Sequence, residues 1–380
     1  MPDGPDKKDF YRKIMALLDW LTLTLTPGCG PATARRLLDH LGEIGAACAT
    51  PATLAGVPGL REEVRRHLGD PAIRQRAAEE LERCRRAGVD LVAWDDPRYP
   101  ALLKEIANPP LVLYVKGNAA LLAAPALAVV GARAATSYGQ KIAGEIGAGL
   151  ARHGFTVVSG LALGIDGVAH RHALRAGGKT IAVLGCGVDL PYPAQHRDLY
   201  QEIADQGALV SDYPLSTPPE GFRFPARNRI ISGLCRGVVV IEAAKHSGSL
   251  ITAELAMEQG REVFAVPGRV DSVKSEGCHR LIREGATLIH NVADIMAELN
   301  YSAPVAAFAQ PAATASSEPL NAEEKCIVAC LEAYPKDIDT IITTTQFSAQ
   351  KVATLLLGLE LKGVVASHPG QQYLRLGATS

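Results

Sequence analysis

The amino-acid sequence predicts an α/β protein built on a doubly wound, mainly parallel sheet, with a helical domain before it and a small domain after it. Between residues 91 and 300, short apolar runs such as "ALAVVG", "TIAVLG" and "GVVVIEA" alternate with longer amphipathic stretches such as "YGQKIAGEIGAGLARHG". Near-continuous apolar strands that alternate with helices are typical of a parallel sheet covered on both faces. We therefore expect an extended Rossmann-like domain over residues 89–300.

The sequence of residues 1–88 predicts a separate helical domain. Two stretches in it are alike, "LTPGCGPATARRLLDHLG" and "LAGVPGLREEVRRHLG", and each places a glycine turn before an amphipathic helix. The pattern resembles paired helix-hairpin-helix or SAM-like units, and in a helix-hairpin-helix unit the backbone N–H groups of the turn contact a DNA phosphate. A plain helical bundle explains the pattern equally well, because nearby glutamates offset the charge of the arginines.

The C-terminal part predicts a linker and a third domain. Residues 301–320, "YSAPVAAFAQPAATASSEPL", have no usable periodicity and are expected to be the linker. Residues 321–380 follow the order helix, helix, turn, helix and hairpin, which resembles a winged-helix domain. Its expected recognition helix, "SAQKVATLLLGLELKG", contains two lysines but also a glutamate. Partner binding or dimerisation is therefore at least as good an interpretation as binding to duplex DNA.

Composition narrows the classes of protein to consider. The formal net charge of -1 excludes a wholly basic nucleic-acid binder but leaves room for a local basic patch. Because the chain contains no apolar run long enough to span a bilayer and no apolar signal-peptide core, we expect a cytoplasmic protein without membrane contact. The 8 cysteines form no CxxC pair, which favours reduced thiols over a disulfide framework.

Two of the loops resemble nucleotide sites only in part. In a doubly wound sheet the ligand lies beyond the carboxyl ends of the strands, so the loops there should carry the function. "VVGARAATSYG" places Arg133 between a strand and a helix but lacks the G-x-G-x-x-G fingerprint, so no dinucleotide or other cofactor is expected. "AGGKT" imitates part of a P-loop but lies between a helix and a strand, the reverse of the required order. Lys179 in this stretch is kept only as a source of positive charge.

The stretch "SGLALGIDGVAHRHAL" contains Asp166, His170 and His172, which invites a metal or acid–base interpretation. Helical residues two apart point in different directions, so the two histidines cannot bind one metal ion together. A structural pairing of Asp166 with His170 at the helix start is the better interpretation, since Asp is a favoured N-cap. We expect no metal site and no catalytic residue in this chain.

Two further stretches predict anion binding at the same edge of the sheet. "SGSLIT" joins a strand to a helix through Ser247, Gly248 and Ser249, and free N–H groups, hydroxyls and a positive helix end together favour an oxyanion. The alternative, a simple capped turn, explains one serine but not the whole cluster.

The second stretch, "FPARNRIISGL", places Arg227, Asn228 and Arg229 at the same predicted edge, where we expect them to be exposed. A structural ion pair inside the domain is the rival interpretation of these arginines. Several phosphate sites in a row suit a polymer backbone better than one nucleotide. Phe224 would stack on a base, as would Phe222. This edge is therefore predicted to be a binding groove.

These motifs, in this order, resemble the DNA-processing protein A family, also called DprA or Smf. The resemblance covers about residues 91–290 densely, and the flanking units match the longer members. Two positions depart from the family pattern: Asp212 stands where Glu is usual, and His279 where Asn is usual. The resemblance implies that these residues contact DNA: Arg133, Ser159, Gly160, Arg227, Asn228, Arg229, Ser247, Gly248 and Ser249.

The resemblance also implies a function. It implies a non-enzymatic homodimer that binds incoming single-stranded DNA during natural transformation, protects it and loads the RecA recombinase onto it. Single-strand-binding protein is a further candidate partner. Two alternatives remain open: a nucleoside-monophosphate phosphoribohydrolase, with "HSGSLITAE" in the place of the catalytic loop, and a transcription regulator acting through residues 321–380.

Overall fold

A computed structural model describes residues 7–49, 51–301, 320–331, 335–368 and 370–375. The chain divides into two compact units, Met1–Phe308 and Ala309–Ser380. Most of the linker expected over residues 301–320 lies outside the described residues. The predicted domain boundaries after residues 88, 300 and 320 stay predictions.

The first unit begins with the helices α1 (Lys7–Leu25), α2 (Pro31–Leu41), α3 (Ile44–Ala49), α4 (Glu62–Leu68) and α5 (Pro71–Arg86). The two predicted glycine turns lie before α2 and α4, and the backbone φ is +76° at Gly28 and +66° at Gly59. Arg61 Nη2 donates to the Gly28 carbonyl at 3.0 Å, and Arg36 Nη1 donates to the Gly59 carbonyl at 2.7 Å. Each turn is thus fixed by an arginine from the other half of the helical region.

A nine-stranded sheet follows, in the order β1-β2-β6-β5-β4-β3-β7-β8-β9. Its strands are β1 (Val89–Ala93), β2 (Val112–Gly117), β3 (Ala126–Gly131), β4 (Thr156–Ser159), β5 (Thr180–Val183), β6 (Ala208–Ser211), β7 (Gly237–Ile241), β8 (Glu262–Ala265) and β9 (Thr287–Leu288). Within this sheet, each strand of the series β6-β5-β4-β3-β7-β8-β9 is parallel to the next. The pairs β1–β2 and β2–β6 are antiparallel. The prediction of a mainly parallel sheet is confirmed, with an antiparallel edge added.

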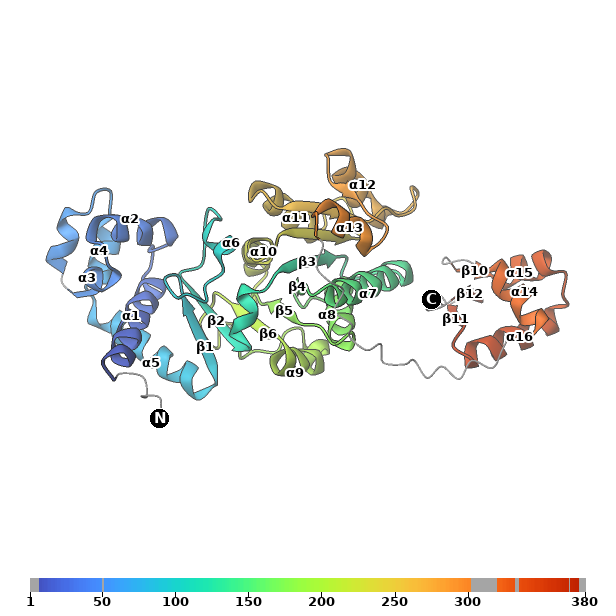
Figure 1. Cartoon of the computed structure of the whole chain (residues 1–380), viewed down its shortest axis with the longest axis horizontal. Helices are drawn as coiled ribbons and strands as arrows, with labels where there is room; N and C mark the ends of the chain where they lie inside the picture. Colours follow the sequence, from blue (N-terminus) through green and yellow to red (C-terminus); the bar gives the residue numbers. More distant parts are fainter. Residues whose placement is uncertain (1–6, 50, 302–319, 332–334, 369, 376–380) are drawn as a thin grey trace. The chain divides into compact units, whose positions relative to one another are not determined.

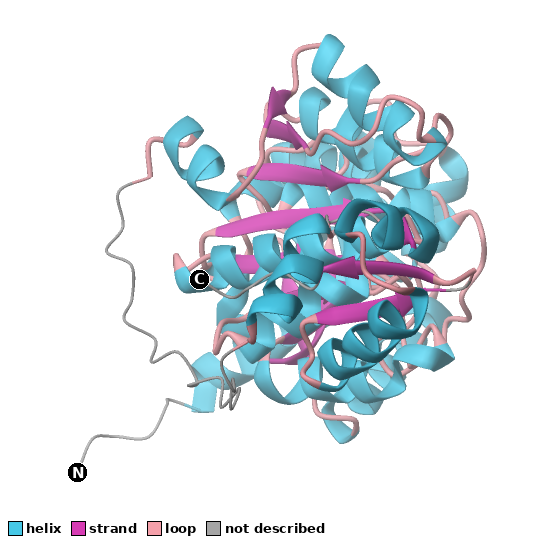
Figure 2. Ribbon diagram, turned by 90° about the vertical axis from the view of Figure 1, so that its right-hand side faces the viewer, coloured by secondary structure: helices cyan, strands magenta, loops and turns pink. Residues whose placement is uncertain are grey.

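Helices cover both faces of the sheet (Figure 2). They are α7 (Ser137–Arg152), α8 (Ile165–Arg175), α9 (Arg197–Gln206), α10 (Arg223–Gly233), α11 (Gly248–Glu258), α12 (Glu276–Arg283) and α13 (Val292–Glu298). On β3, Leu127 and Val129 pack in a cluster with α7, α8 and α13, while Ala128 and Val130 pack in a cluster with α10, α11 and α12. Because side chains alternate between the faces of a strand, this pattern confirms the doubly wound fold.

The helical region packs against the antiparallel edge of the sheet (Figure 1). Trp20 of α1, Tyr114 of β2 and Leu215 belong to one buried apolar cluster. The short helix α6 (Ala101–Lys104) and the chain after it connect β1 to β2 beside this cluster. The helical region and the sheet therefore share a core.

The second unit contains α14 (Ala322–Cys330), β10 (Lys336–Asp337), α15 (Ile338–Thr345), α16 (Ala349–Leu361), β11 (Val365–His368) and β12 (Gln372–Arg375). Its strands form a small sheet in the order β10-β12-β11, as in a winged helix. Lys351 pairs with Glu323 at 2.6 Å, and Lys362 pairs with Glu324 at 2.8 Å. Both lysines of the expected recognition helix are thus engaged with carboxylates of their own unit.

Candidate nucleic-acid interface

A groove of about 730 Å³ lies at the centre of the carboxyl edge of the sheet. The strand order reverses where β3 and β7 lie side by side, and ligands of doubly wound sheets bind at such a switch point. The groove is formed by the loops after β3 and β7 together with α10, α11 and the chain before α12. It brings together these predicted site residues: Arg133, Phe224, Arg227, Asn228, Ser247, Gly248 and Ser249.

The helix that follows β3 already holds an anion from the protein itself. Glu242, at the end of β7, accepts a hydrogen bond from the Thr136 backbone N–H at 2.8 Å and a second from the Thr136 hydroxyl. Thr136 is the N-cap of α7, and its hydroxyl in turn accepts from the Gly139 N–H at 3.1 Å. A Cβ atom at Gly139 would lie 2.4 Å from Glu242 Oε2, so the carboxylate rests directly on the first turn. The positive end of α7 is therefore occupied.

The start of the helix that follows β7 is not hydrogen bonded to a carboxylate of the described residues. Ser247 caps α11, and its hydroxyl lies 2.8 Å from the Ser249 hydroxyl. The first turn contains no acidic residue, and Gly248 is exposed. Asn228 donates to the Gly248 carbonyl at 3.4 Å, a long hydrogen bond that joins α10 to α11. Hydroxyls, backbone groups and the helix dipole thus converge on one side of the groove.

Aromatic rings and an arginine form a column that reaches into the groove through Arg133 and Phe224. The Arg133 guanidinium, on the exposed loop after β3, lies 5.9 Å from the centroid of the Phe224 ring. The Phe224 ring stacks on Tyr192, with 5.5 Å between centroids and 23° between planes. Gly185 makes room for Phe224, because a Cβ atom there would lie 2.8 Å from the ring. The column combines a cation with stackable rings, which is what a single strand of nucleic acid requires.

Sequence reasoning missed three residues of this region, Tyr192, Lys245 and Lys274. Lys245 is exposed, lines the groove and directly precedes "HSGS". Its position beside a predicted anion loop could have indicated its place in the site. Lys274 Nζ donates to the Ala134 carbonyl at 2.5 Å and so holds the loop after β3. Tyr192 lies in "LPYP", a motif that carries little information alone.

Arg227 is placed differently from the expectation that it would be exposed. It lies in helix α10, is only 5% exposed, and donates from Nη1 to the carbonyls of Gly160, at 3.1 Å, and Val183. A Cβ atom at Gly160 would lie 2.6 Å from Arg227 Nη2 and 2.9 Å from Asp166 Oδ2, so both side chains lie close to this glycine. Burial lowers the pKa of Arg227 to about 10 and raises the pKa of Asp166, while each charge counteracts the shift of the other.

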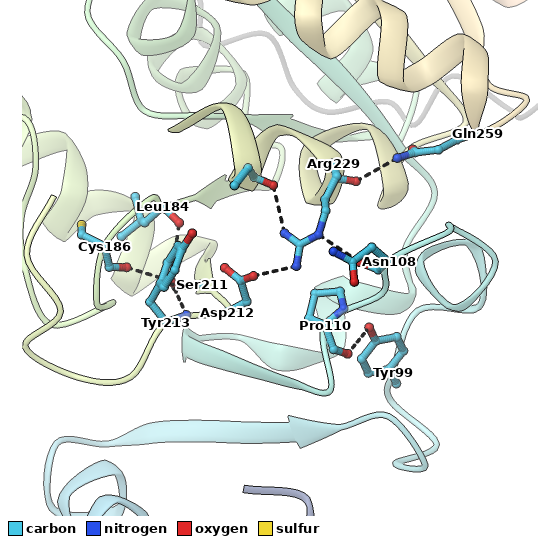
Figure 3. A network of polar contacts seen from close by, with 11 residues as sticks. Tyr99, Asn108, Pro110, Leu184, Cys186, Ser211, Asp212, Tyr213, Arg229 and Gln259 are labelled. Atoms are coloured by element: carbon cyan, nitrogen blue, oxygen red, sulfur yellow. Dashed lines mark hydrogen bonds and ion pairs between the residues drawn. The ribbon is translucent and has the colours of Figure 1, made fainter. Parts of the chain in front are cut away.

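Arg229 is also largely engaged within the protein (Figure 3). It donates from Nη2 to Asp212 at 2.8 Å, from Nε to the Asn108 carbonyl at 2.9 Å, and from Nη1 to the Ala226 carbonyl at 3.0 Å. Asp212, which departs from the family pattern, is therefore the ion-pair partner of Arg229. His279, the other departure, lies 3.1 Å from the Gly268 carbonyl through Nε2.

The remaining predicted residues do not line the groove. Ser159 is fully buried and donates from its hydroxyl to the Val129 carbonyl at 2.6 Å. The Gly160 N–H donates to Asp166 at 3.1 Å. Lys179 is exposed but directly precedes β5, at the amino edge of the sheet, opposite the groove. The structure does not place Lys179 with the other cations, because it follows α8 rather than a strand.

The expected pairing of Asp166 with His170 is wrong. Asp166 accepts from the backbone N–H groups of Gly160 and Ala162, at 3.1 and 3.3 Å. His170 lies 2.6 Å from the Thr180 hydroxyl through Nδ1, and Thr180 donates its own proton to the Val157 carbonyl. Nδ1 must therefore carry the imidazole proton. His170 Nε2 is buried without a partner.

Because His170 is buried in its neutral form, the stability of the folded protein should fall in acid. Burial lowers the pKa of His170 to about 3, so the unfolded chain takes up the proton first as the pH falls below about 6.5. The loss of stability approaches about 1.4 kcal/mol per pH unit between these values. The prediction is checked by denaturant unfolding at several pH values, with His170→Asn as the comparison. Equal slopes for the two proteins would show that His170 does not stay neutral.

The described parts of the chain contain no group of three or more His, Cys, Asp or Glu side chains that could hold a metal ion. Glu254, which would be the catalytic carboxylate of a phosphoribohydrolase, pairs with Arg280 at 2.9 Å and does not line the groove. Among the helices of the described residues, none is long and apolar enough to cross a membrane.

Fold and site together define a doubly wound α/β protein with a basic, aromatic groove at the switch point and a winged helix after it. A family model described as DNA recombination-mediator protein A matches residues 90–300, and one described as DprA winged helix domain matches residues 311–371. The chain belongs to the DNA recombination-mediator protein A family, as its motifs predict.

Individual relatives agree with this assignment. Protein Smf of Synechocystis sp. is 35% identical over 389 residues, which cover 94% of this chain and 98% of that protein. DNA processing protein DprA of Streptococcus pneumoniae is 49% identical over 206 residues, 54% of this chain and 73% of that protein.

Two solved structures are also similar. The X-ray structure of DNA processing protein A from Streptococcus pneumoniae has a TM-score of 0.60 and 36% identity, covering 78% of this chain and 99% of that chain. The Helicobacter pylori DNA processing protein A, solved to study its single-stranded DNA binding mode, has a TM-score of 0.52 and 30% identity, covering 57% of this chain and 97% of that chain.

Proposed function

We propose that this protein is a recombination mediator that binds single-stranded DNA in the groove, protects incoming DNA during natural transformation, and loads RecA onto it. The observation that carries the proposal is the column of Arg133, Phe224 and Tyr192, whose first two members line the same groove as the start of α11. Aromatic side chains and arginines in a groove stack on bases, and a helix start with hydroxyls accepts a phosphate. Family membership supports the same role.

We further propose that the protein acts without catalysis and without a cofactor. The phosphoribohydrolase alternative requires a free carboxylate beside the anion site. Glu254 is held by Arg280, and Glu242 is hydrogen bonded to Thr136. The engagement of both carboxylates with protein groups supports a role without catalysis. A homodimer, contact with single-strand-binding protein and a cytoplasmic location stay predictions, the first of which sedimentation would test.

A RecA strand-exchange assay tests the proposal. On DNA coated beforehand with single-strand-binding protein, addition of this protein should restore exchange, because a mediator bound to the strand helps RecA displace the coat. Lys179→Ala is a matched control that removes an exposed lysine at the far edge of the sheet and should retain full activity. A protein that binds the strand yet leaves exchange blocked would contradict RecA loading. Release of free base from nucleoside monophosphates at an enzyme-like rate would favour the hydrolase instead.

A further inference from the structure

A second pocket of about 350 Å³ lies between the helical region and the antiparallel edge of the sheet. Its wall on the helical side comes from α1 and α2 and includes Trp20 and Arg35. Its other wall comes from the chain between β1 and β2 and includes Trp94, Lys104 and Pro109. A cavity of this size with an apolar wall and a few polar groups is typical of a ligand site.

The pocket contains both tryptophans of the chain. Trp20 is buried, Trp94 is half-buried, and their ring centroids lie 6.1 Å apart. Lys104 Nζ lies 5.0 Å from the centroid of the Trp94 ring. An indole beside an ammonium group offers a stacking surface and a phosphate contact within the reach of one nucleotide.

The charge of the pocket is also suited to an anionic ligand. Lys104 and Arg35 form no ion pair with any carboxylate of the described residues, and Arg35 is exposed at the rim. Glu105 is the acidic residue of the lining, and its carboxylate lies 3.3 Å from Arg261 Nη2. The negative charge is thereby compensated, while two positive charges stay available.

The pocket is connected to the groove through α10 and α11. The Asn108 carbonyl, on the chain that lines the pocket, accepts from Arg229 of α10 at 2.9 Å (Figure 3). Arg261, just after α11, donates to the Leu102 carbonyl at 2.8 Å. Gln259 donates to the Arg229 carbonyl at 3.2 Å. The helices that line the groove therefore also fix the wall of the pocket.

We propose that this pocket receives one base of the single-stranded DNA held by the groove, with the adjoining phosphate on Lys104 and Arg35. The inference rests on the proposed function, because it extends the path of the same strand. The base would pack beside Trp94, and the strand would pass over α10 between the two sites. Only strands long enough to span both sites would reach the pocket.

Tryptophan fluorescence tests this directly, because the groove contains no tryptophan among its lining residues. The full-length Trp20→Phe variant, with Trp94 as its single tryptophan, is titrated with labelled oligothymidylates of graded length. Trp94 emission should be quenched only by the longer strands, with the same midpoint as the anisotropy of the label. Lys104→Gln and Arg35→Gln should remove most of the quenching and weaken the binding of long strands by about tenfold or more. Lys179→Gln is the matched control and should change neither signal.

The two readouts separate the two proposals. If anisotropy shows binding but Trp94 emission stays constant, the pocket is not a base site and the inference is overturned while the groove remains. Quenching that persists unchanged in Lys104→Gln and Arg35→Gln would overturn it as well, since it would then come from an indirect change. If no strand binds at all, the proposed function fails and the inference falls with it. Melting temperatures of all variants verify that each one is folded.

Discussion

Arg227→Ala should lower the free energy of unfolding by about 3 to 5 kcal/mol, because two buried carbonyls lose their donor and the buried Asp166 loses a nearby positive charge. Its guanidinium donates to the carbonyls of Gly160 and Val183, and it compensates the buried carboxylate of Asp166. Without Arg227, the Asp166 carboxylate, which is only 6% exposed, loses this nearby positive charge. Chemical denaturation of the purified variant measures the loss.

Two comparisons make this prediction specific. Arg133→Ala removes the same side chain from an exposed loop and should change stability by less than about 0.5 kcal/mol. The double variant Arg227→Ala/Asp166→Asn should lose less free energy of unfolding than the two single variants together. Each single substitution leaves one buried charge without its neighbour, whereas the double variant contains neither charge. An Arg227→Ala protein that melts like the wild type but binds DNA weakly would show that Arg227 contacts DNA rather than supporting the fold.

Arg133→Ala combined with Lys245→Ala should weaken the binding of single-stranded DNA without lowering the melting temperature. Each side chain is exposed in the groove, and a charge-assisted hydrogen bond to phosphate contributes about 1.5 to 3 kcal/mol, or roughly tenfold or more in affinity. The weakening should be similar for every DNA sequence, since phosphate contacts carry no sequence information.

Salt dependence identifies the cause of that weakening. Each lost phosphate contact lowers the slope of log affinity against log salt by roughly 0.7, so the double variant should lose about 1.4. Anisotropy titrations at several salt concentrations measure this slope. Lys179→Ala serves as the control, because it also removes one positive charge but lies at the opposite edge of the sheet. A double variant with weak binding and an unchanged slope would mean that these side chains do not meet phosphate.

Much of the groove could be predicted because its parts follow from local order along the chain. Arg133 and Ser247 each lie in a loop between an apolar strand and a helix, and parallel strands bring such loops to one edge. The roles of Arg227 and Arg229 could not be predicted in this way. Residues two apart on a helix point in different directions, so Arg227 binds buried carbonyls while Arg229 binds Asp212.

Partners that are distant in sequence explain the other differences. His170 was expected to bond with Asp166 in its own helix, but Thr180, on the next strand, binds it instead. Tyr192 joins Phe224 only because the loop after β5 reaches α10. Nothing in the spacing of these residues indicates such contacts, since they depend on how elements pack.

Glu242 has a consequence for the entropy of binding. Its φ of +53° is unusual for a residue with a side chain, and its bonds to Thr136 tie the loop that carries Arg133 to the strand that leads into Lys245. Lys274 holds the same loop from the other side. The groove is thus preorganised, and nearly all of the ordering required for binding falls on the DNA strand. A strand whose bases stack strongly on one another must first be unstacked to fit, whereas a flexible strand fits at little cost. We therefore expect the protein to favour flexible, pyrimidine-rich strands even though its charged contacts read no bases.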